Sequence, residues 1–214
     1  HIERTRRLKA GEPLSAVTDD FRHRFGIAAR LLPMSDDPVR TRLRTAAGWL
    51  DFQDYFVRLR CAPAVEALAI SGAAAARAHP DFLALLDDRR LGLVVICPSN
   101  PFLSIDPILG LPGVRPALRA CRAPVVAVSP IIGGRAVKGP TGKIMAELGL
   151  PVDAAAVARH YADILDLYIA DEADAGALAG LDLPVAVAPT LMVTLEDRDR
   201  LARSVLAAAD HVQK

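Results

Sequence analysis

Residues 91–113 read LGLVVICPSNPFLSIDPILGLPG, an apolar run that leads into a polar segment rich in Pro and Gly. Its beginning, residues 91–96, is a short apolar run of the kind that forms a strand buried on both faces. The part that follows is rich in Ser, Asn, Pro and Gly, and a simple connection between two elements needs only a few such residues. The stretch therefore predicts a buried strand that opens into a loop built to hold a ligand.

Other parts of the chain repeat the pattern of a short apolar run followed by a helix. Further strands are predicted at residues 124–128, 167–170 and 185–188. Helices are predicted at residues 114–121, 143–148, 154–165 and 201–212. Because strands that alternate with helices form βαβ units, we predict the α/β fold class, with a mostly parallel sheet and helices on both of its faces.

The first third of the chain follows a different pattern. A helix over residues 13–26 precedes a hairpin, which is predicted from the exposed strand pattern of residues 40–44 and the small residues 46–48. A short helix at 51–58, a strand at 65–70 and a helix at 80–88 follow. We therefore expect a small inserted helical and hairpin subdomain around residues 13–60.

Composition excludes several classes of function. The chain has 26 basic and 25 acidic residues and 5% aromatic residues, so no nucleic-acid surface is expected. No apolar run reaches the ~20 residues that span a bilayer, and no signal peptide is visible. The three cysteines form no CxxC pair, which argues against a disulfide framework or a zinc site. We predict a cytoplasmic protein with reduced thiols, in which Cys97 is a small core residue.

Two loops follow predicted strands at the edge where open α/β sheets bind ligands. The first carries Ser99 and Asn100, whose side chains offer hydrogen-bond donors. The second, residues 129–143, contains several glycines and cations, namely Gly133, Gly134, Arg135, Lys138, Gly139, Gly142 and Lys143. It is not a Walker A loop, because Ile144 stands where Ser or Thr is required. These loops favour phosphate or nucleotide binding, and loops whose glycines only form turns are the alternative.

Weaker candidates lie elsewhere. Asp36 and Asp37 are a carboxylate pair for metal or acid–base chemistry, or ordinary turn formers. Three acidic residues follow the third apolar run, namely Asp171, Glu172 and Asp174. They could bind a metal, but the favoured interpretation is a solvated loop. For His160 we expect packing on a helix surface.

Several short stretches, in order along nearly the whole chain, carry a family resemblance. They are HIERT (1–5), LPMSDDPV (32–39), DFQDYFV (51–57), PSNP (98–101), SI (104–105), PIL (107–109), VAVSPIIG (126–133), VKGP (137–140) and TLM (190–192). Together they resemble the 2-phospho-L-lactate transferases of coenzyme F420 biosynthesis, known as CofD, or FbiA in actinobacteria. The resemblance implies one Rossmann-like α/β domain over residues 1–214 that lacks the family's N-terminal strands.

The resemblance implies a transferase with two substrates. The donor is a guanosine diphosphate ester of lactate or enolpyruvate, and the acceptor is the deazaflavin Fo. The ribityl hydroxyl of Fo attacks the phosphorus that carries the small acid, and GMP leaves. A Mg²⁺ ion is expected to offset the diphosphate charge. The family also suggests a homodimer.

The resemblance places substrate-binding residues in groups. Ser99 and Asn100 are expected where the donor diphosphate meets the acceptor hydroxyl, with Ser104 supporting the loop. Lys138 and Gly139 are expected to add donor contacts. The residues expected to border the deazaflavin are Met34, Ser35, Asp36, Asp37, Phe52 and Gln53. Arg4 is expected near the junction of the two ligands, and no catalytic residue or metal ligand is assigned.

Two departures from the family pattern are visible. Asp106 stands where the family motif Ser-Ile-Gly-Pro has glycine, which adds a carboxylate near the expected diphosphate. The N-terminal part, which carries a glycine-rich nucleotide loop and an Asp-Leu-Asp segment for the metal, is absent from this sequence. The alternatives are therefore a non-catalytic nucleotide or nucleotide-sugar binding regulator of the YvcK-like type, or an inactive fragment.

Overall fold

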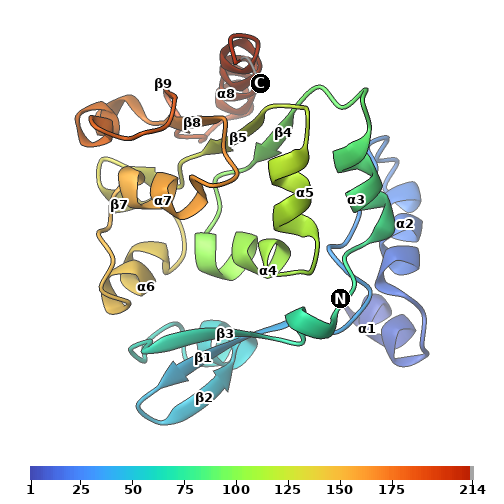
Figure 1. Cartoon of the computed structure of the whole chain (residues 1–214). Helices are drawn as coiled ribbons and strands as arrows, with labels where there is room; N and C mark the ends of the chain where they lie inside the picture. The colour runs from blue at the N-terminus through green and yellow to red at the C-terminus, as the bar shows by residue number, and fades with distance from the viewer. Residues whose placement is uncertain (213–214) are drawn as a thin grey trace.

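A four-stranded parallel sheet forms the centre of the fold in the computed structural model, which describes residues 1–212. The strands are β4 (Val94–Ile96), β5 (Val125–Val128), β8 (Leu167–Ala170) and β9 (Val185–Val187), and they lie side by side in this order. All three pairings between neighbours are parallel. The predicted α/β architecture is confirmed, and each strand forms within its predicted apolar run (Figure 1).

The two inner strands are buried on both faces, which explains their continuous apolar sequences. Successive side chains of a strand point to opposite faces of the sheet. Val125 and Ala127 of β5 accordingly join one apolar cluster together with Tyr168 of β8, while Val126 and Val128 join a second cluster. The parallel sheet therefore separates two hydrophobic cores.

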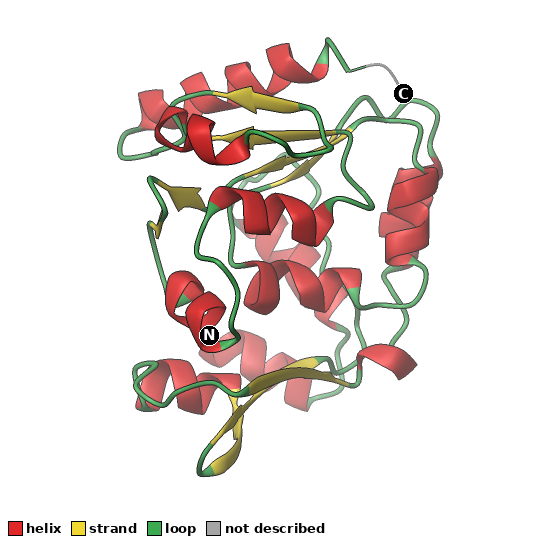
Figure 2. Ribbon diagram, turned by 60° about the vertical axis from the view of Figure 1, so that its left-hand side comes forward, coloured by secondary structure: helices red, strands yellow, loops and turns green. Residues whose placement is uncertain are grey.

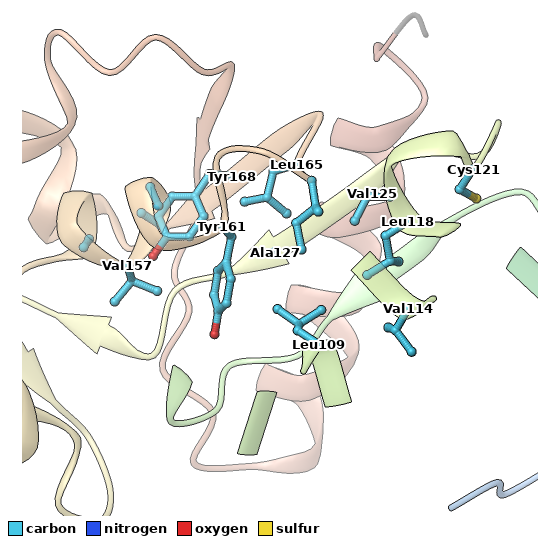
Figure 3. Close-up of a cluster of buried hydrophobic side chains, with 14 of the residues drawn as sticks. Leu109, Val114, Leu118, Cys121, Val125, Ala127, Val157, Tyr161, Leu165 and Tyr168 are labelled. Atoms are coloured by element: carbon cyan, nitrogen blue, oxygen red, sulfur yellow. The ribbon is translucent and has the colours of Figure 1, made fainter. Parts of the chain in front are cut away.

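Helices cover both faces of this sheet, as predicted. α5 (Val114–Ala120) and α7 (Ala154–Tyr161) pack on one face, where Leu118, Val157 and Tyr161 meet β5 and β8 (Figure 3). α8 (Leu195–Ala209) lies across the other face (Figure 1).

The closing helix starts earlier than the sequence pattern suggested. The prediction began it at residue 201, because the apolar residues Leu201, Val205 and Ala209 recur at helical spacing from there. The observed start at Leu195 is set by a capping box. Thr194 accepts a hydrogen bond from the Asp197 amide, and the Asp197 carboxylate accepts one from the Thr194 amide at 2.8 Å.

A second, antiparallel sheet contains the predicted hairpin. It consists of β1 (Arg40–Thr45), β2 (Gly48–Asp51) and β3 (Ala67–Ser71), in the order β2-β1-β3. The π-helical turn η1 (Asp54–Arg58) and α6 (Thr141–Glu147) pack on it around a third apolar core that includes Leu43, Tyr55 and Ile144. Figure 2 shows the two sheets at opposite ends of the molecule with helices between them.

The remaining elements are short or peripheral. Three further helices are α1 (Ile2–Lys9), α2 (Leu14–Arg24) and α3 (Pro80–Asp87). The other elements are η2 (Ala73–Ala75), η3 (Pro101–Ile105), α4 (Asp106–Leu109), β6 (Ile131–Ile132), β7 (Arg135–Ala136) and η4 (Glu172–Leu178). No helix within residues 1–212 has the length and apolar content that crossing a membrane requires. The expectation of a core position for Cys97 is wrong, because its side chain is exposed just beyond the edge strand β4.

Candidate functional site

A hollow of about 550 Å³ lies beyond the carboxyl ends of the parallel strands. Segments that follow β4, β5 and β9 line it. Ligands of open α/β sheets bind at this edge. We call this cavity the strand-end hollow; its polar lining residues are Ser99, Asn100, Ser104, Ser129, Lys138, Thr141 and Thr190. The two strand-end loops that the sequence singled out therefore meet in one site.

Asn100 is held in a defined orientation at this hollow. Its Oδ1 accepts hydrogen bonds from the amides of Phe102 and Leu103, both at 3.0 Å, and so caps the turn η3. These two bonds fix which end of the side chain is the oxygen. The Nδ2 group is buried and has no partner within residues 1–212. Because a buried N–H without an acceptor is costly, Asn100 is suited to donate to a bound ligand.

The Gly133–Gly134 turn of the glycine-rich loop is already filled by a carboxylate. Buried Asp174 accepts hydrogen bonds from the amides of Gly133 and Gly134, both at 2.9 Å. Both glycines have positive φ angles, of 56° and 70°, so the turn suits glycine. These amides are thus satisfied inside the protein, and the favoured interpretation of Asp174 as part of a solvated loop is wrong.

The two lysines of this loop have different roles. Lys138 lines the strand-end hollow and makes no ion pair within residues 1–212. Lys143 instead donates to the carbonyl of Pro63 at 2.8 Å and pairs with Glu147 at 2.5 Å. Burial acts to lower the pKa of Lys143, but Glu147 and Tyr55 outweigh it and raise that pKa above its usual value. Lys143 therefore ties α6 to the loop that precedes β3, and Lys138 is free to meet an anion.

Asp171, which follows β8, positions a hydroxyl of the hollow. Its Oδ2 accepts hydrogen bonds from the amide of Thr190 at 2.8 Å and from its hydroxyl at 3.0 Å. Burial acts to raise the pKa of Asp171, but the bonds from Thr190 and Ala173 outweigh it and hold that pKa below its ordinary value. The ionised carboxylate consequently fixes Thr190 in the wall.

A second hollow, of about 580 Å³, adjoins the first and opens against the antiparallel sheet. We call it the hairpin hollow. Its apolar walls come from Met34, Val39, Phe52, Leu103, Pro107 and Ile108. Its polar lining consists of Arg40, Thr41, Asp51, Gln53 and Ser104. A cavity with long apolar walls and a few polar groups suits a flat organic ring that carries hydrogen-bonding edges.

The two hollows share part of their lining. Among residues 1–212, Phe52, Leu103 and Ser104 line both. The Phe52 ring also stacks on that of Phe56, with ring centroids 5.3 Å apart. Two ligands bound in the two hollows would therefore touch the same three side chains.

Most of the predicted site residues line one or both hollows. Those that do are Met34, Phe52, Gln53, Ser99, Asn100, Ser104, Lys138 and Gly139. Arg4 lies exposed on α1 and lines neither hollow. Their roles in binding stay predictions.

Ser35, Asp36 and Asp37 do not line the hollows but hold the loop that precedes β1. The Ser35 hydroxyl donates to the carbonyl of Arg77 at 2.6 Å. Asp36 accepts from the amide and hydroxyl of Ser15, both at 2.7 Å, and Asp37 accepts from the amide of Arg77 at 2.7 Å. These side chains thus fix the backbone around Met34, which does line the hairpin hollow.

Asp106 lines neither hollow. Its Oδ1 lies 2.7 Å from Nε2 of His160 on α7. Phe102 also packs edge-on against the His160 ring, with centroids 5.3 Å apart. The residue that departs from the family motif therefore braces the first loop against α7, and His160 does more than pack on a helix surface.

Sequence reasoning missed several lining residues. Thr190 follows the fourth predicted strand, so the strand-end rule applied to the other loops also identifies it. Arg40 and Thr41 belong to the hairpin and reach the hollow through tertiary packing, and no sequence signal marks them. Asp51 also lies in the hairpin, and it begins the stretch DFQDYFV that carries the family resemblance.

The described residues do not fit a magnesium site. No group of three or more His, Cys, Asp and Glu side chains within residues 1–212 is arranged to hold a metal ion. Asp171 and Asp174 accept hydrogen bonds from backbone amides instead.

Comparison with known proteins gives consistent matches. The family described as 2-phospho-L-lactate transferase CofD matches residues 1–180. A 2-phospho-L-lactate transferase from Methanosarcina mazei is 40% identical over 211 residues, which cover 97% of this chain and 68% of that protein. A phosphoenolpyruvate transferase from Streptomyces griseus is 38% identical over 221 residues, covering 100% of this chain and 69% of that protein.

A solved structure shares the fold. A member of the UPF0052 family from Bacillus halodurans (BH3568) superposes with a TM-score of 0.64 at 12% identity, covering 94% of this chain and 69% of that one. At this identity the likeness concerns the fold alone.

Proposed function

The chain belongs to the 2-phospho-L-lactate transferase CofD family, a family of transferases, and from this membership we propose its substrates. We propose that it moves a phospholactyl or phosphoenolpyruvyl group from a guanosine diphosphate ester to the ribityl hydroxyl of the deazaflavin Fo, releasing GMP, in coenzyme F420 biosynthesis. Relatives with either transferase name are similarly close, at 40% and 38% identity, so both small acids stand as candidates.

The observation that carries this proposal is the pair of adjoining hollows with a common wall. A group transfer between two substrates needs both to be bound at once with their reacting atoms in contact. Cavities of about 550 and 580 Å³ that share Phe52, Leu103 and Ser104 meet this need. A protein that binds one nucleotide needs only one of them.

We assign the guanosine diphosphate ester to the strand-end hollow. Asn100 Nδ2 and the hydroxyl of Ser99 offer donors to phosphate oxygens, and Lys138 offers an unpaired positive charge. Charge-assisted hydrogen bonds of this kind are the strong ones. Ser99 and Asn100 follow Cys97 and Pro98 in the loop after β4, where the diphosphate would lie.

We assign Fo to the hairpin hollow. Met34, Phe52 and Pro107 provide flat apolar contact for a tricyclic ring, while Thr41 and Gln53 provide hydrogen bonds for its polar edge. The ribityl chain would then extend toward the common wall. There its hydroxyl oxygen bonds to the phosphorus that carries the small acid, and the P–O bond to GMP breaks. GMP keeps that electron pair and leaves with the hydroxyl proton on its phosphate.

The expected magnesium ion stands as a proposal on chemical grounds alone. A bound Mg²⁺ would neutralise diphosphate charge during the transfer. Because the described residues offer no group of three or more His, Cys, Asp and Glu side chains for it, the ligands of the ion would have to include the diphosphate itself.

Transfer is tested by mixing the protein with Fo, Mg²⁺ and each guanylated donor, and measuring GMP and the product by mass spectrometry. We expect product with at least one donor, and at least a tenfold loss of turnover in Asn100→Ala. An Asn100→Ala variant with normal turnover would contradict the loop assignment. Binding of GMP without binding of Fo would favour the nucleotide-binding regulator instead. Light scattering would measure whether the protein forms the predicted homodimer, and cell fractionation its predicted cytoplasmic location.

A further inference from the structure

The common wall of the two hollows contains one polar side chain. Phe52 and Leu103 are apolar, so Ser104 supplies the hydroxyl where the hollows meet. Any ligand atom that passes from one hollow toward the other must cross this wall. Ser104 therefore lies beside the place where the reacting atoms of the two proposed substrates come together.

The backbone of Ser104 is fixed while its side chain is free. Its amide donates to the carbonyl of Asn100 at 3.0 Å, within the turn η3 that the Asn100 side chain caps. Pro101, at the start of this turn, is buried, and Asp106 at its end bonds to His160. The Ser104 side chain is exposed, and its hydroxyl makes no hydrogen bond within residues 1–212. A fixed backbone with an unengaged hydroxyl is suited to orient a ligand.

We propose that the Ser104 hydroxyl is a catalytic group that aligns the acceptor hydroxyl with the phosphorus under attack; this inference rests on the proposed function. A serine hydroxyl both donates and accepts hydrogen bonds. It can accept from the attacking hydroxyl and donate to a non-bridging oxygen of the donor phosphorus at the same time. Such alignment of two reactants lowers the entropic part of the barrier.

The proton balance does not involve Ser104. The acceptor oxygen bonds to phosphorus, the P–O bond to GMP breaks with its electron pair on GMP, and the acceptor proton leaves on the GMP phosphate. Ser104 keeps its own proton throughout, so it acts as an orienting group and not as a general base.

The kinetic test compares Ser104→Ala with Ser104→Thr, which keeps a hydroxyl, and with the distant control Ser204→Ala on α8. We expect Ser104→Ala to lower kcat by about 10- to 100-fold, somewhat less than the loss of an oxyanion-hole donor. The KM for each substrate should change by less than about twofold, because the aligned contact is made in the transition state. Ser104→Thr should recover most of the turnover, and Ser204→Ala should match the wild type.

A binding test checks the position of Ser104 without turnover. Ser104→Trp should weaken the binding of GMP, measured by calorimetry, and the binding of Fo, measured by fluorescence, because the new side chain would enter both hollows. Thr190→Trp should weaken GMP alone, and Thr41→Trp should weaken Fo alone. If Ser104→Trp weakened the binding of only one of the two ligands, the inference would be overturned.

The outcomes separate this inference from the proposed function. Turnover in the wild type together with unchanged kcat in Ser104→Ala would overturn the role of Ser104 and leave the proposed function standing. A wild-type protein that binds neither GMP nor Fo would overturn both.

Discussion

Gly72 is the position where a single methyl group should disturb one hollow and spare the other. It precedes the turn η2 with φ 87° and ψ −15°, a left-handed conformation. A Cβ built on Gly72 would approach the carbonyl oxygen of Pro38 closer than 3.0 Å, and this oxygen belongs to the backbone. No rotamer change can relieve the overlap, so in Gly72→Ala the chain at residues 38–40 must move.

Gly113 provides a matched control. It precedes α5 with φ 85° and ψ −19°, almost the same conformation. A Cβ there would meet only the Cδ1 atom of Leu83 at 3.9 Å, an ordinary contact. A left-handed alanine costs roughly 1–2 kcal/mol, and this cost applies to both variants. The overlap with Pro38 adds roughly 1–3 kcal/mol, the usual cost of forcing extra volume into a packed site.

Thermal unfolding followed by circular dichroism measures both costs. A domain of this size loses about 2–4 °C in Tm per kcal/mol. We therefore expect Gly113→Ala to lose about 2–8 °C, and Gly72→Ala to lose a further 2–12 °C or so. Gly72→Ala should also weaken Fo and leave GMP binding near normal, because Val39 and Arg40 line the hairpin hollow. Equal Tm losses in the two variants would refute the reasoning.

Three further predictions concern charged groups. Asp106→Ala, His160→Ala and the double variant should be compared by urea unfolding. We expect a coupling free energy of about 1 kcal/mol, because the two side chains share a partly buried hydrogen bond. If the losses in unfolding free energy were simply additive, the contact between Asp106 and His160 would not stabilise the fold. Lys138→Ala should raise the donor KM about tenfold with unchanged Tm, whereas Lys143→Ala should lower Tm; the reverse pattern would show the two roles exchanged. The lowered pKa of Asp171 stabilises the fold above its ordinary pKa of 3.8, and this contribution is lost as pH falls below that value. The fall in Tm below pH 3.8 should therefore be smaller in Asp171→Asn than in the wild type. Identical profiles of Tm against pH for the two proteins would contradict this role of Asp171.

The parallel sheet could be predicted because its sequence signal is local and strong. β5 and β8 are buried on both faces, so their residues are continuously apolar and cannot be mistaken for a surface strand. The strand-end rule then located Ser99, Asn100 and Lys138 without knowledge of any contact. Helix α1 gave no comparable signal, because it has no buried residue.

The contacts that decide individual roles could not be predicted, because their partners lie far apart in the sequence. Asp174 fills the Gly133–Gly134 turn from about 40 residues away, and a turn filled by a carboxylate has the same glycines as one that binds phosphate. Asp36 and Asp37 are likewise committed to Ser15 and Arg77, which are 21 and 40 residues away. The hairpin hollow exists only through the packing of residues 34–53 against residues 103–108.

The two hollows take most of their walls from different stretches of the chain. Apart from the common wall, the hairpin hollow depends chiefly on residues 34–53, and the strand-end hollow on residues 98–100, 129–141 and 190–192. If the two hollows hold the substrates proposed for them, substitutions in the first stretch other than at Phe52 can change the preference for the acceptor and leave the residues on the donor side unchanged. An exchange of residues 34–53 between relatives would make this separability directly visible as a hybrid enzyme.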